Sequence, residues 1–107
     1  MATLNGRMVE RDFGQTYIGD LEEKWAIEFH NSVNIVELRH WGTTLIEFDY
    51  LKRTVFTETL YSQSKTDKDG LNWFFEKFNI DLHAHYYPSK EETQIHNNFD
   101  DSTFYIV

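Results

Sequence analysis

The chain has 107 residues, among them no cysteine, one proline and five glycines. Without cysteine, it cannot form disulfide bonds, thiolate metal sites or a cysteine nucleophile. Secreted domains of this size often depend on disulfides, so their absence favours a reducing, cytoplasmic environment. No apolar stretch has the length of a membrane-spanning helix, and the N-terminal residues do not resemble a signal peptide.

Basic residues are scarce: 10 Lys and Arg stand against 18 Asp and Glu, giving a formal net charge of −8. Nucleic acids and anionic membranes are bound mainly through Lys and Arg, so we expect neither as a direct partner. An acidic surface attracts a basic one. The composition therefore favours a basic protein partner, although the same charge also serves solubility.

Motifs with their own chemistry are also missing. The chain has no Gly-x-Ser-x-Gly nucleophile turn and no glycine-rich phosphate loop. His30 and His40 stand apart from any catalytic pattern. We therefore predict that the protein is not an enzyme and needs no cofactor.

Aromatic residues, in contrast, make up 17% of the chain. Large rings stabilise a small core, and they are also enriched at binding hot spots, so composition does not separate these two uses. The length fits one domain spanning residues 1–107, and no repeat or linker interrupts it.

Alternating hydrophobicity predicts strands in the first half of the chain. Trp25, Ile27 and Phe29 occupy one face of a strand over residues 25–30. Two further strands, residues 33–40 and 44–50, form a hairpin around the tight turn at Gly42. A regular hairpin groups the following residues on the face that we expect to be the core: Val33, Ile35, Ile46, Phe48 and Tyr50.

The second half adds one helix and more strands. Leu71, Phe74, Phe75 and Phe78 form a helical apolar stripe, with Thr66 as the expected N-cap and Asn79 as the end. Flanking segments are predicted as follows: strands over residues 54–61, 81–87 and 103–107, and a polar loop over 89–101. The fold class is α+β, an antiparallel meander of about four to six strands packed by one amphipathic helix.

One local motif has the composition of a metal site. Asp81, His83 and His85 would share a face of their strand, and His96 could join them. Two histidines and one carboxylate can bind iron or zinc with open positions. The same pattern is also typical of the polar face of an edge strand.

Candidate partner-binding residues come from acidic pairs and from the hairpin tip. The acids could imitate DNA phosphates or fill a basic groove, while Trp41 beside Arg39 could anchor the contact or fold back onto the core. The predicted partner-binding residues are Glu22, Glu23, Arg39, Trp41, Glu91, Glu92, Asp100 and Asp101.

Part of the chain resembles a recurrent, mostly uncharacterised family of small phage proteins. The resemblance covers residues 30–80: the run His-Trp-Gly-Thr-Thr-Leu-Ile-Glu-Phe-Asp at 40–49, the strand that ends at Tyr61, the Ser/Thr-rich segment 62–66, and Leu71-Asn72 before an aromatic helix. It implies a phage origin and brings no catalytic residues. In size, charge and lack of cysteine the chain is also similar to anti-CRISPR inhibitors.

These observations predict a phage-encoded acidic interaction protein, acting in the cytoplasm of a bacterial host cell. Its expected partner is a basic nucleic-acid-binding protein, in particular a Cas nuclease whose nucleic-acid surface it would occupy. One alternative is a small metal-binding protein or metalloenzyme that uses Asp81, His83 and His85. The other is a phage structural or assembly protein that self-associates through its C-terminal strand.

Overall fold

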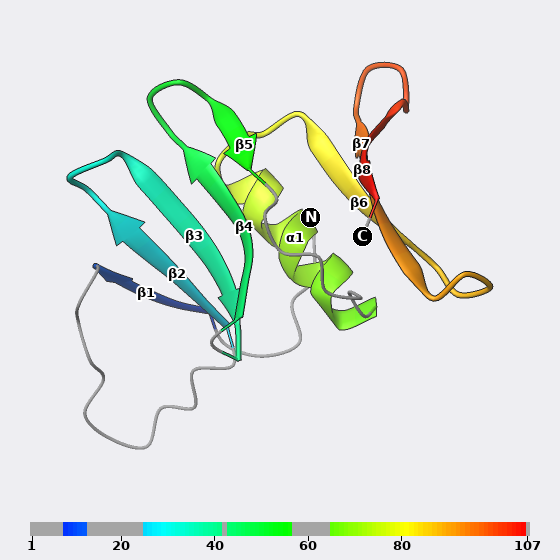
Figure 1. Ribbon diagram of the computed structural model, residues 1–107, viewed down its shortest axis with the longest axis horizontal. Helices are drawn as coiled ribbons and strands as arrows, with labels where there is room; N and C mark the ends of the chain where they lie inside the picture. Colours follow the sequence, from blue (N-terminus) through cyan, green and yellow to red (C-terminus); the bar gives the residue numbers. More distant parts are fainter. Residues whose placement is uncertain (1–7, 13–24, 42, 57–64, 107) are drawn as a thin grey trace. The chain divides into compact units, whose positions relative to one another are not determined.

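The computed structural model describes residues 8–12, 25–41, 43–56 and 65–106 (Figure 1). The protein is α+β, as predicted, and the described part contains one helix and eight strands. The elements are β1 (Met8–Asp12), β2 (Trp25–His30), β3 (Ile35–His40), β4 (Thr43–Asp49), β5 (Thr54–Phe56), α1 (Lys65–Lys77), β6 (Leu82–Tyr87), β7 (Glu92–Asn97) and β8 (Thr103–Ile106).

The chain divides into two compact units. One unit holds a five-stranded sheet in the order β1-β2-β3-β4-β5, in which β1 runs parallel to β2 and the other pairs are antiparallel. The other unit holds α1 and a three-stranded antiparallel sheet in the order β6-β7-β8. The expectation of a single domain stays a prediction, because compactness does not tell whether one unit folds without the other.

The β3–β4 hairpin differs from the regular one expected from the sequence. His40 pairs with Thr43 around the turn, but the register then shifts, so that Leu38 faces Ile46 and Leu45 is left over. This β-bulge moves every later side chain of β4 to the opposite face. The residues that share the buried face are therefore Val36, Leu38, Ile46 and Phe48, each at most 1% exposed.

The predicted core face of this hairpin was therefore wrong for three of its five members, Val33, Ile35 and Tyr50, none of which is buried. Ile35 lies opposite Asp49, on the same face as Glu37, and is only half-buried. Val33 is 56% exposed in the turn before β3.

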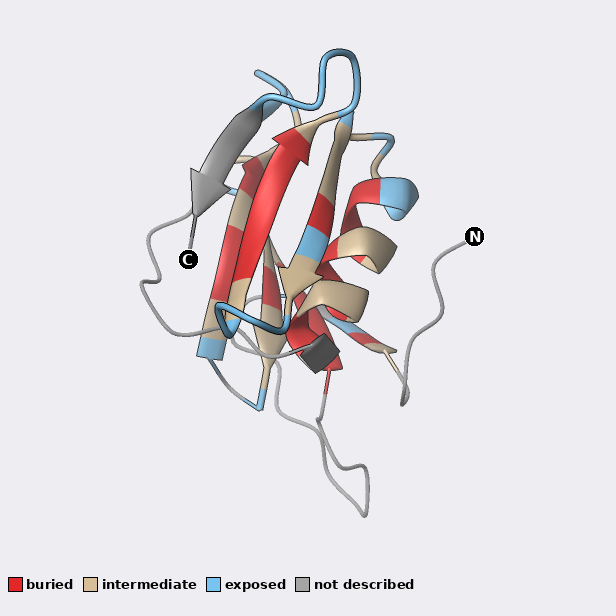
Figure 2. Ribbon diagram, turned by 90° about the vertical axis from the view of Figure 1, so that its right-hand side faces the viewer, coloured by how far each residue is buried: buried red, intermediate tan, exposed pale blue. Residues whose placement is uncertain are grey.

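In β2, where no bulge intervenes, Trp25 and Ile27 of the predicted face are completely buried, whereas Phe29 is half-buried. The opposite face of this strand is also buried, at Ala26 and Glu28. In both units the buried residues lie on strands and on the helix, and the exposed ones gather in the turns (Figure 2).

Helix α1 begins one residue before the predicted cap and ends as predicted. Thr66 therefore lies inside its first turn, with Asp67 also there, where a carboxylate favours the helix dipole. Asn79 takes the left-handed conformation (φ 52°), and the Ile80 N–H donates to the Phe75 carbonyl at 2.8 Å. Such a left-handed residue is the usual end of a helix. The apolar stripe is buried at Leu71, Phe74 and Phe75.

The segment expected to be a polar loop contains β7, the central strand of the smaller sheet. Its sequence, Glu-Thr-Gln-Ile-His-Asn, is polar, yet Thr93 is completely buried and His96 is 7% exposed. The His96 ring contacts the Asp101 carbonyl at 2.9 Å and the Gln94 side chain at 3.0 Å, and these hydrogen bonds offset its burial. The polarity of the sequence therefore concealed a strand here. The C-terminal strand β8 pairs with β7, as expected, and forms an edge of the sheet.

Asn72 connects α1 to the free edge of β6. Its side-chain oxygen accepts the Ala84 N–H at 2.7 Å, and its amide donates to the Ala84 carbonyl at 3.0 Å. The side chain therefore pairs with the backbone as a neighbouring strand would. This contact satisfies two backbone groups of a half-buried edge.

Removing this pairing gives a graded prediction. Asn72→Ala leaves both Ala84 backbone groups without their partner, and the free energy of unfolding should fall by about 1–3 kcal/mol. Asn72→Asp keeps the acceptor for the Ala84 N–H but loses the donor to the Ala84 carbonyl. At neutral pH it should therefore lose less stability than Asn72→Ala. Urea denaturation of the three proteins measures the order, and equal stabilities of all three would contradict this role.

Candidate functional site

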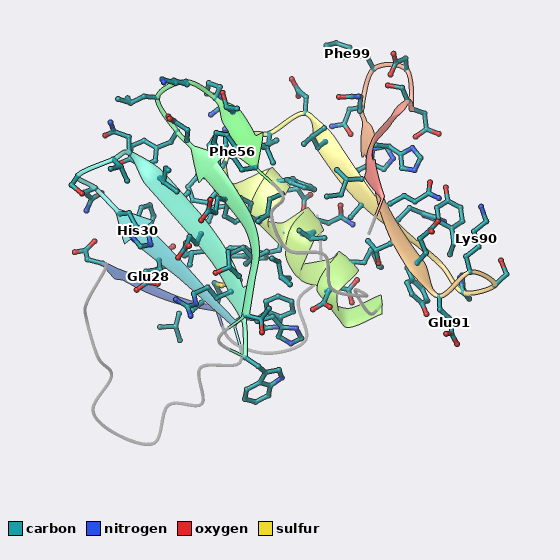
Figure 3. All side chains as sticks on the ribbon, viewed as in Figure 1. Glu28, His30, Phe56, Lys90, Glu91 and Phe99 are labelled. Atoms are coloured by element: carbon teal, nitrogen blue, oxygen red, sulfur yellow. The ribbon has the colours of Figure 1, made fainter. Side chains whose placement is uncertain are left out.

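The turn between β7 and β8, residues 98–102, presents the most exposed large apolar side chain of the described residues. Phe99 is 90% exposed and stands at the tip of the turn (Figure 3). Asp100 and Asp101 follow it directly and are also exposed. An aromatic ring next to two carboxylates has the composition of an anchor for a basic partner.

Hydrogen bonds hold the backbone of this turn in one conformation. The Asn97 N–H donates to the Ser102 carbonyl at 2.9 Å, and the Asp101 N–H donates to the Asn97 carbonyl at 3.0 Å. Asp101 takes a left-handed conformation with φ 56°, which Asp tolerates better than most residues. The position of Phe99 is thus fixed by its neighbours rather than by contacts of its own ring.

Side chains add to this rigidity. Ser102 donates both its N–H (3.0 Å) and its hydroxyl (2.7 Å) to one carboxylate oxygen of Asp100. These hydrogen bonds lower the pKa of the Asp100 carboxyl below its ordinary value, because they stabilise the ionised form. Asp100 therefore stays negatively charged to a lower pH than an isolated aspartate.

Two histidines support the turn from the sheet. The rings of His83 in β6 and His96 in β7 are stacked, with centroids 5.6 Å apart. His83 contacts Asn98 at 2.7 Å and the Asp101 carboxylate at 3.2 Å, while His96 contacts the Asp101 carbonyl at 2.9 Å. Two of the three histidines that the sequence suggested as metal ligands thus contact the acidic turn instead.

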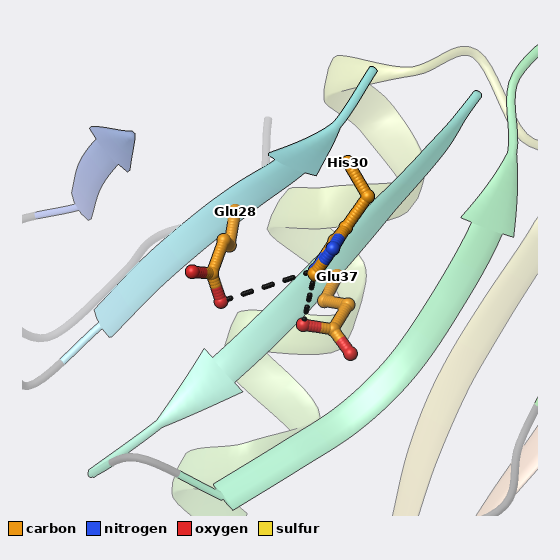
Figure 4. A group of neighbouring side chains, drawn as sticks. All are labelled: Glu28, His30 and Glu37. Atoms are coloured by element: carbon orange, nitrogen blue, oxygen red, sulfur yellow. Dashed lines mark hydrogen bonds and ion pairs between the residues drawn. The ribbon is translucent and has the colours of Figure 1, made fainter. Parts of the chain in front are cut away.

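The proposed metal motif does not converge. His85 is exposed and its ring packs against Tyr87 with centroids 4.6 Å apart, and Asp81 is exposed before β6. Within the described residues, one group brings three His or carboxylate ligand atoms within 4.8 Å of one another, and it contains none of these residues. Its members are Glu28, His30 and Glu37 (Figure 4).

This cluster lies on one face of the five-stranded sheet, and Trp25 and Ile27 lie on the other face. The His30 Nε2 atom is 2.9 Å from a Glu37 carboxylate oxygen and 4.0 Å from one of Glu28. The Arg39 guanidinium contacts the same Glu28 oxygen at 2.8 Å. The side chain of Glu28 is 7% exposed, and its contact with Arg39 offsets part of the cost of burying it.

Alternation in β2 had placed Glu28 and His30 on one face, but the sequence did not bring Glu37 to them. That contact depends on the register of β2 with β3, in which Glu28 lies opposite Glu37. Arg39, expected at a partner surface, is committed to this cluster, with 28% of its side chain exposed. Trp41 is 60% exposed at the hairpin tip, where the sequence placed it.

The structure separates the remaining acidic candidates. Glu91 and Glu92 lie at the β6–β7 turn, whereas Asp100 and Asp101 lie at the other end of β7, as Figure 3 shows for Glu91 and Phe99. A strand of this length spans roughly 17 Å, so the two pairs do not make one continuous patch. Glu22 and Glu23 lie outside the described residues.

No helix in the described residues has the length and apolarity needed to cross a membrane. No protein family model, curated protein or solved structure matches this chain.

Proposed function

We propose that the protein is an acidic interaction protein that binds a basic surface through the β7–β8 turn. The exposure of Phe99 carries this proposal, because a ring that is 90% exposed on a hydrogen-bonded turn gains nothing within the fold. A rigid turn loses little conformational entropy when it binds, so its anchor residue can contribute most of its contact energy. In a complex, the ring fills an apolar pocket.

Charge defines the class of partner. Asp100 and Asp101 directly follow the anchor, and the chain as a whole carries a net charge of −8. Such a field speeds association with a basic protein surface. Nucleic-acid-binding grooves are the most basic surfaces that proteins commonly display, so occupation of such a groove is the proposed action.

The resemblance of residues 30–80 to small phage proteins makes the proposal more specific. A phage protein that occupies a basic groove inhibits the nuclease to which that groove belongs. Cas nucleases of bacterial hosts are the first partners to test. In this function the protein is not an enzyme, and neither nucleic acid nor a membrane is its direct partner.

The test is binding to a panel of purified Cas nucleases loaded with guide RNA, together with DNA cleavage at two salt concentrations. Binding should weaken as salt rises, since exposed charges are screened, and cleavage should fall with occupancy. If the protein neither binds nor inhibits any member of the panel, a Cas nuclease is not its partner.

Phe99→Ala should weaken the binding found in this panel by about 2 kcal/mol, roughly thirtyfold in Kd, as for a hot-spot aromatic residue. The matched control is Phe56→Ala, because Phe56 is also exposed (41%) but lies in the five-stranded sheet. Both variants should keep the wild-type stability. Equal affinity of Phe99→Ala and wild type would rule out the β7–β8 turn as the contact site.

A further inference from the structure

The cluster of Glu28, His30 and Glu37 places an imidazole nitrogen between two carboxylates on neighbouring strands. We infer that these three side chains bind one divalent transition-metal ion, of the class of Zn²⁺, Fe²⁺ or Mn²⁺. The inference is independent of the proposed function, since the cluster lies in the five-stranded sheet and the binding turn lies in the other unit. It rests on ligand spacing, ligand chemistry and burial.

The spacing fits a first-row ion. Ligand atoms about 2.0–2.2 Å from a zinc ion lie roughly 3–3.5 Å from one another. The His30 Nε2 atom is 2.9 Å from Glu37 and 4.0 Å from Glu28, so these separations lie on both sides of that range. All three ligand atoms lie within 4.8 Å of one another, so small movements of the side chains are enough to place them around one ion.

The ligand types select the metal. Imidazole suits Zn²⁺, Fe²⁺ and other transition ions, whereas Ca²⁺ and Mg²⁺ prefer sites made of oxygen alone. A metal ion binds the Nε2 atom of His30 only when this atom carries no proton. The ion takes the place of that proton, and the other ring nitrogen, Nδ1, carries the single proton of the neutral imidazole. Three protein ligands leave at least one coordination position for water or a substrate.

The surroundings favour a defined site over a loose acidic patch. The exposed fractions of the three side chains are 7% for Glu28, 14% for Glu37 and 22% for His30. Partial burial lowers the local dielectric constant and strengthens the attraction between the carboxylates and a cation. Adjacent strands of one sheet also hold the ligands more precisely than a loop does.

Arg39 has two opposing effects on this site. Its positive charge disfavours a cation, which keeps the affinity below that of a site without the arginine. However, a carboxylate oxygen has two lone pairs, so Glu28 can accept the 2.8 Å hydrogen bond from Arg39 and still bind metal. A ligating carboxylate that is itself hydrogen-bonded is the usual arrangement in metal sites.

The experiment titrates the full chain, stripped with a chelator, with Zn²⁺ by calorimetry and with Co²⁺ by visible absorbance. Wild type should bind one ion, and Co²⁺ should show the d–d bands of a nitrogen–oxygen site. His30→Gln and Glu37→Gln should each weaken binding by about tenfold or more. His85→Gln is the matched control, because His85 is exposed in β6, and it should bind as wild type does.

Near-UV circular dichroism checks that each variant keeps its aromatic packing. Glu37→Gln preserves the shape of the side chain, so it tests the site even if His30→Gln fails to fold. The inference is overturned if wild type binds no stoichiometric ion, or if neither ligand variant weakens binding. It is equally overturned if His85→Gln abolishes binding, which would place the ion in the three-stranded sheet.

Discussion

Deleting Leu45 should leave the protein folded, whereas deleting Glu47, two residues further along β4, should prevent folding. Leu45 is the extra residue of the β-bulge, so without it Ile46 still faces Leu38 and Phe48 still faces Val36. The cost is the loss of one buried leucine side chain, about 2–4 kcal/mol. The pairing beyond the bulge remains as it is.

Loss of Glu47 has a different consequence, because a one-residue shift changes the face of every later side chain. Phe48, now 1% exposed, would point to the face that carries Glu28 and Glu37, and Asp49 would point into the core. Removing a buried phenylalanine costs about 3–5 kcal/mol by itself, and a buried carboxylate without a partner adds to this. The sum approaches the whole stability of a small domain, about 5–15 kcal/mol.

The measurement is the dispersion of amide signals in a two-dimensional NMR spectrum, followed by urea denaturation of any folded variant. Leu45→Ala is the control, because it removes the side chain and keeps the backbone residue. A folded Glu47 deletion, or two deletions of equal stability, would show that the bulge does not set the register of this hairpin.

Replacing Arg39 alone should be among the most damaging single substitutions on the polar face of the five-stranded sheet. Arg39→Met removes the guanidinium that contacts Glu28 at 2.8 Å and leaves a carboxylate that is 7% exposed without this counter-charge. Breaking a buried ion pair from one side costs about 3 kcal/mol or somewhat more. Because 28% of the Arg39 side chain is exposed, we expect a loss of stability at the lower end of the range for buried ion pairs.

The double variant Glu28→Leu/Arg39→Met should recover most of that loss. With both charges removed, Glu28 no longer leaves a buried carboxylate without its counter-charge, and apolar replacements of buried ion pairs are often neutral or stabilising. Lys52→Met is the matched control, since it removes one positive charge from an exposed turn residue and should change stability by no more than about 0.5 kcal/mol. Urea denaturation of these four proteins and of the single variant Glu28→Leu gives the coupling between Glu28 and Arg39, and a double variant less stable than Arg39→Met would contradict it.

The double variant also tests the metal inference from a second direction. Glu28→Leu removes one of the three proposed ligands while the fold is retained. Zn²⁺ binding should therefore be lost from a protein whose stability is close to that of wild type.

Local sequence patterns were enough to predict the fold class and several elements. Alternation in β2 predicted its bounds and the burial of Trp25 and Ile27, because no bulge interrupts the strand and period two is directly visible. It did not predict that Ala26 and Glu28 on the other face are buried too. The aromatic stripe of α1 and the stop at Asn79 were also local signals, since a helix is built from contacts three and four residues apart. Turn chemistry alone placed Trp41 at the hairpin tip, but its exposure of 60% is decided by the structure.

The remaining features follow from tertiary contacts, because the residues that determine them are distant in the chain. The bulge at Leu45 sets which hairpin residues are buried, yet one extra residue leaves no mark on composition. The sequence of β7 resembles a loop because it is polar. The strand tolerates this polarity because the His96 ring hydrogen-bonds to the Asp101 carbonyl and to the side chain of Gln94 in the same strand. Glu37 joins Glu28 and His30 only through strand register, which sequence patterns leave open when turn lengths are uncertain.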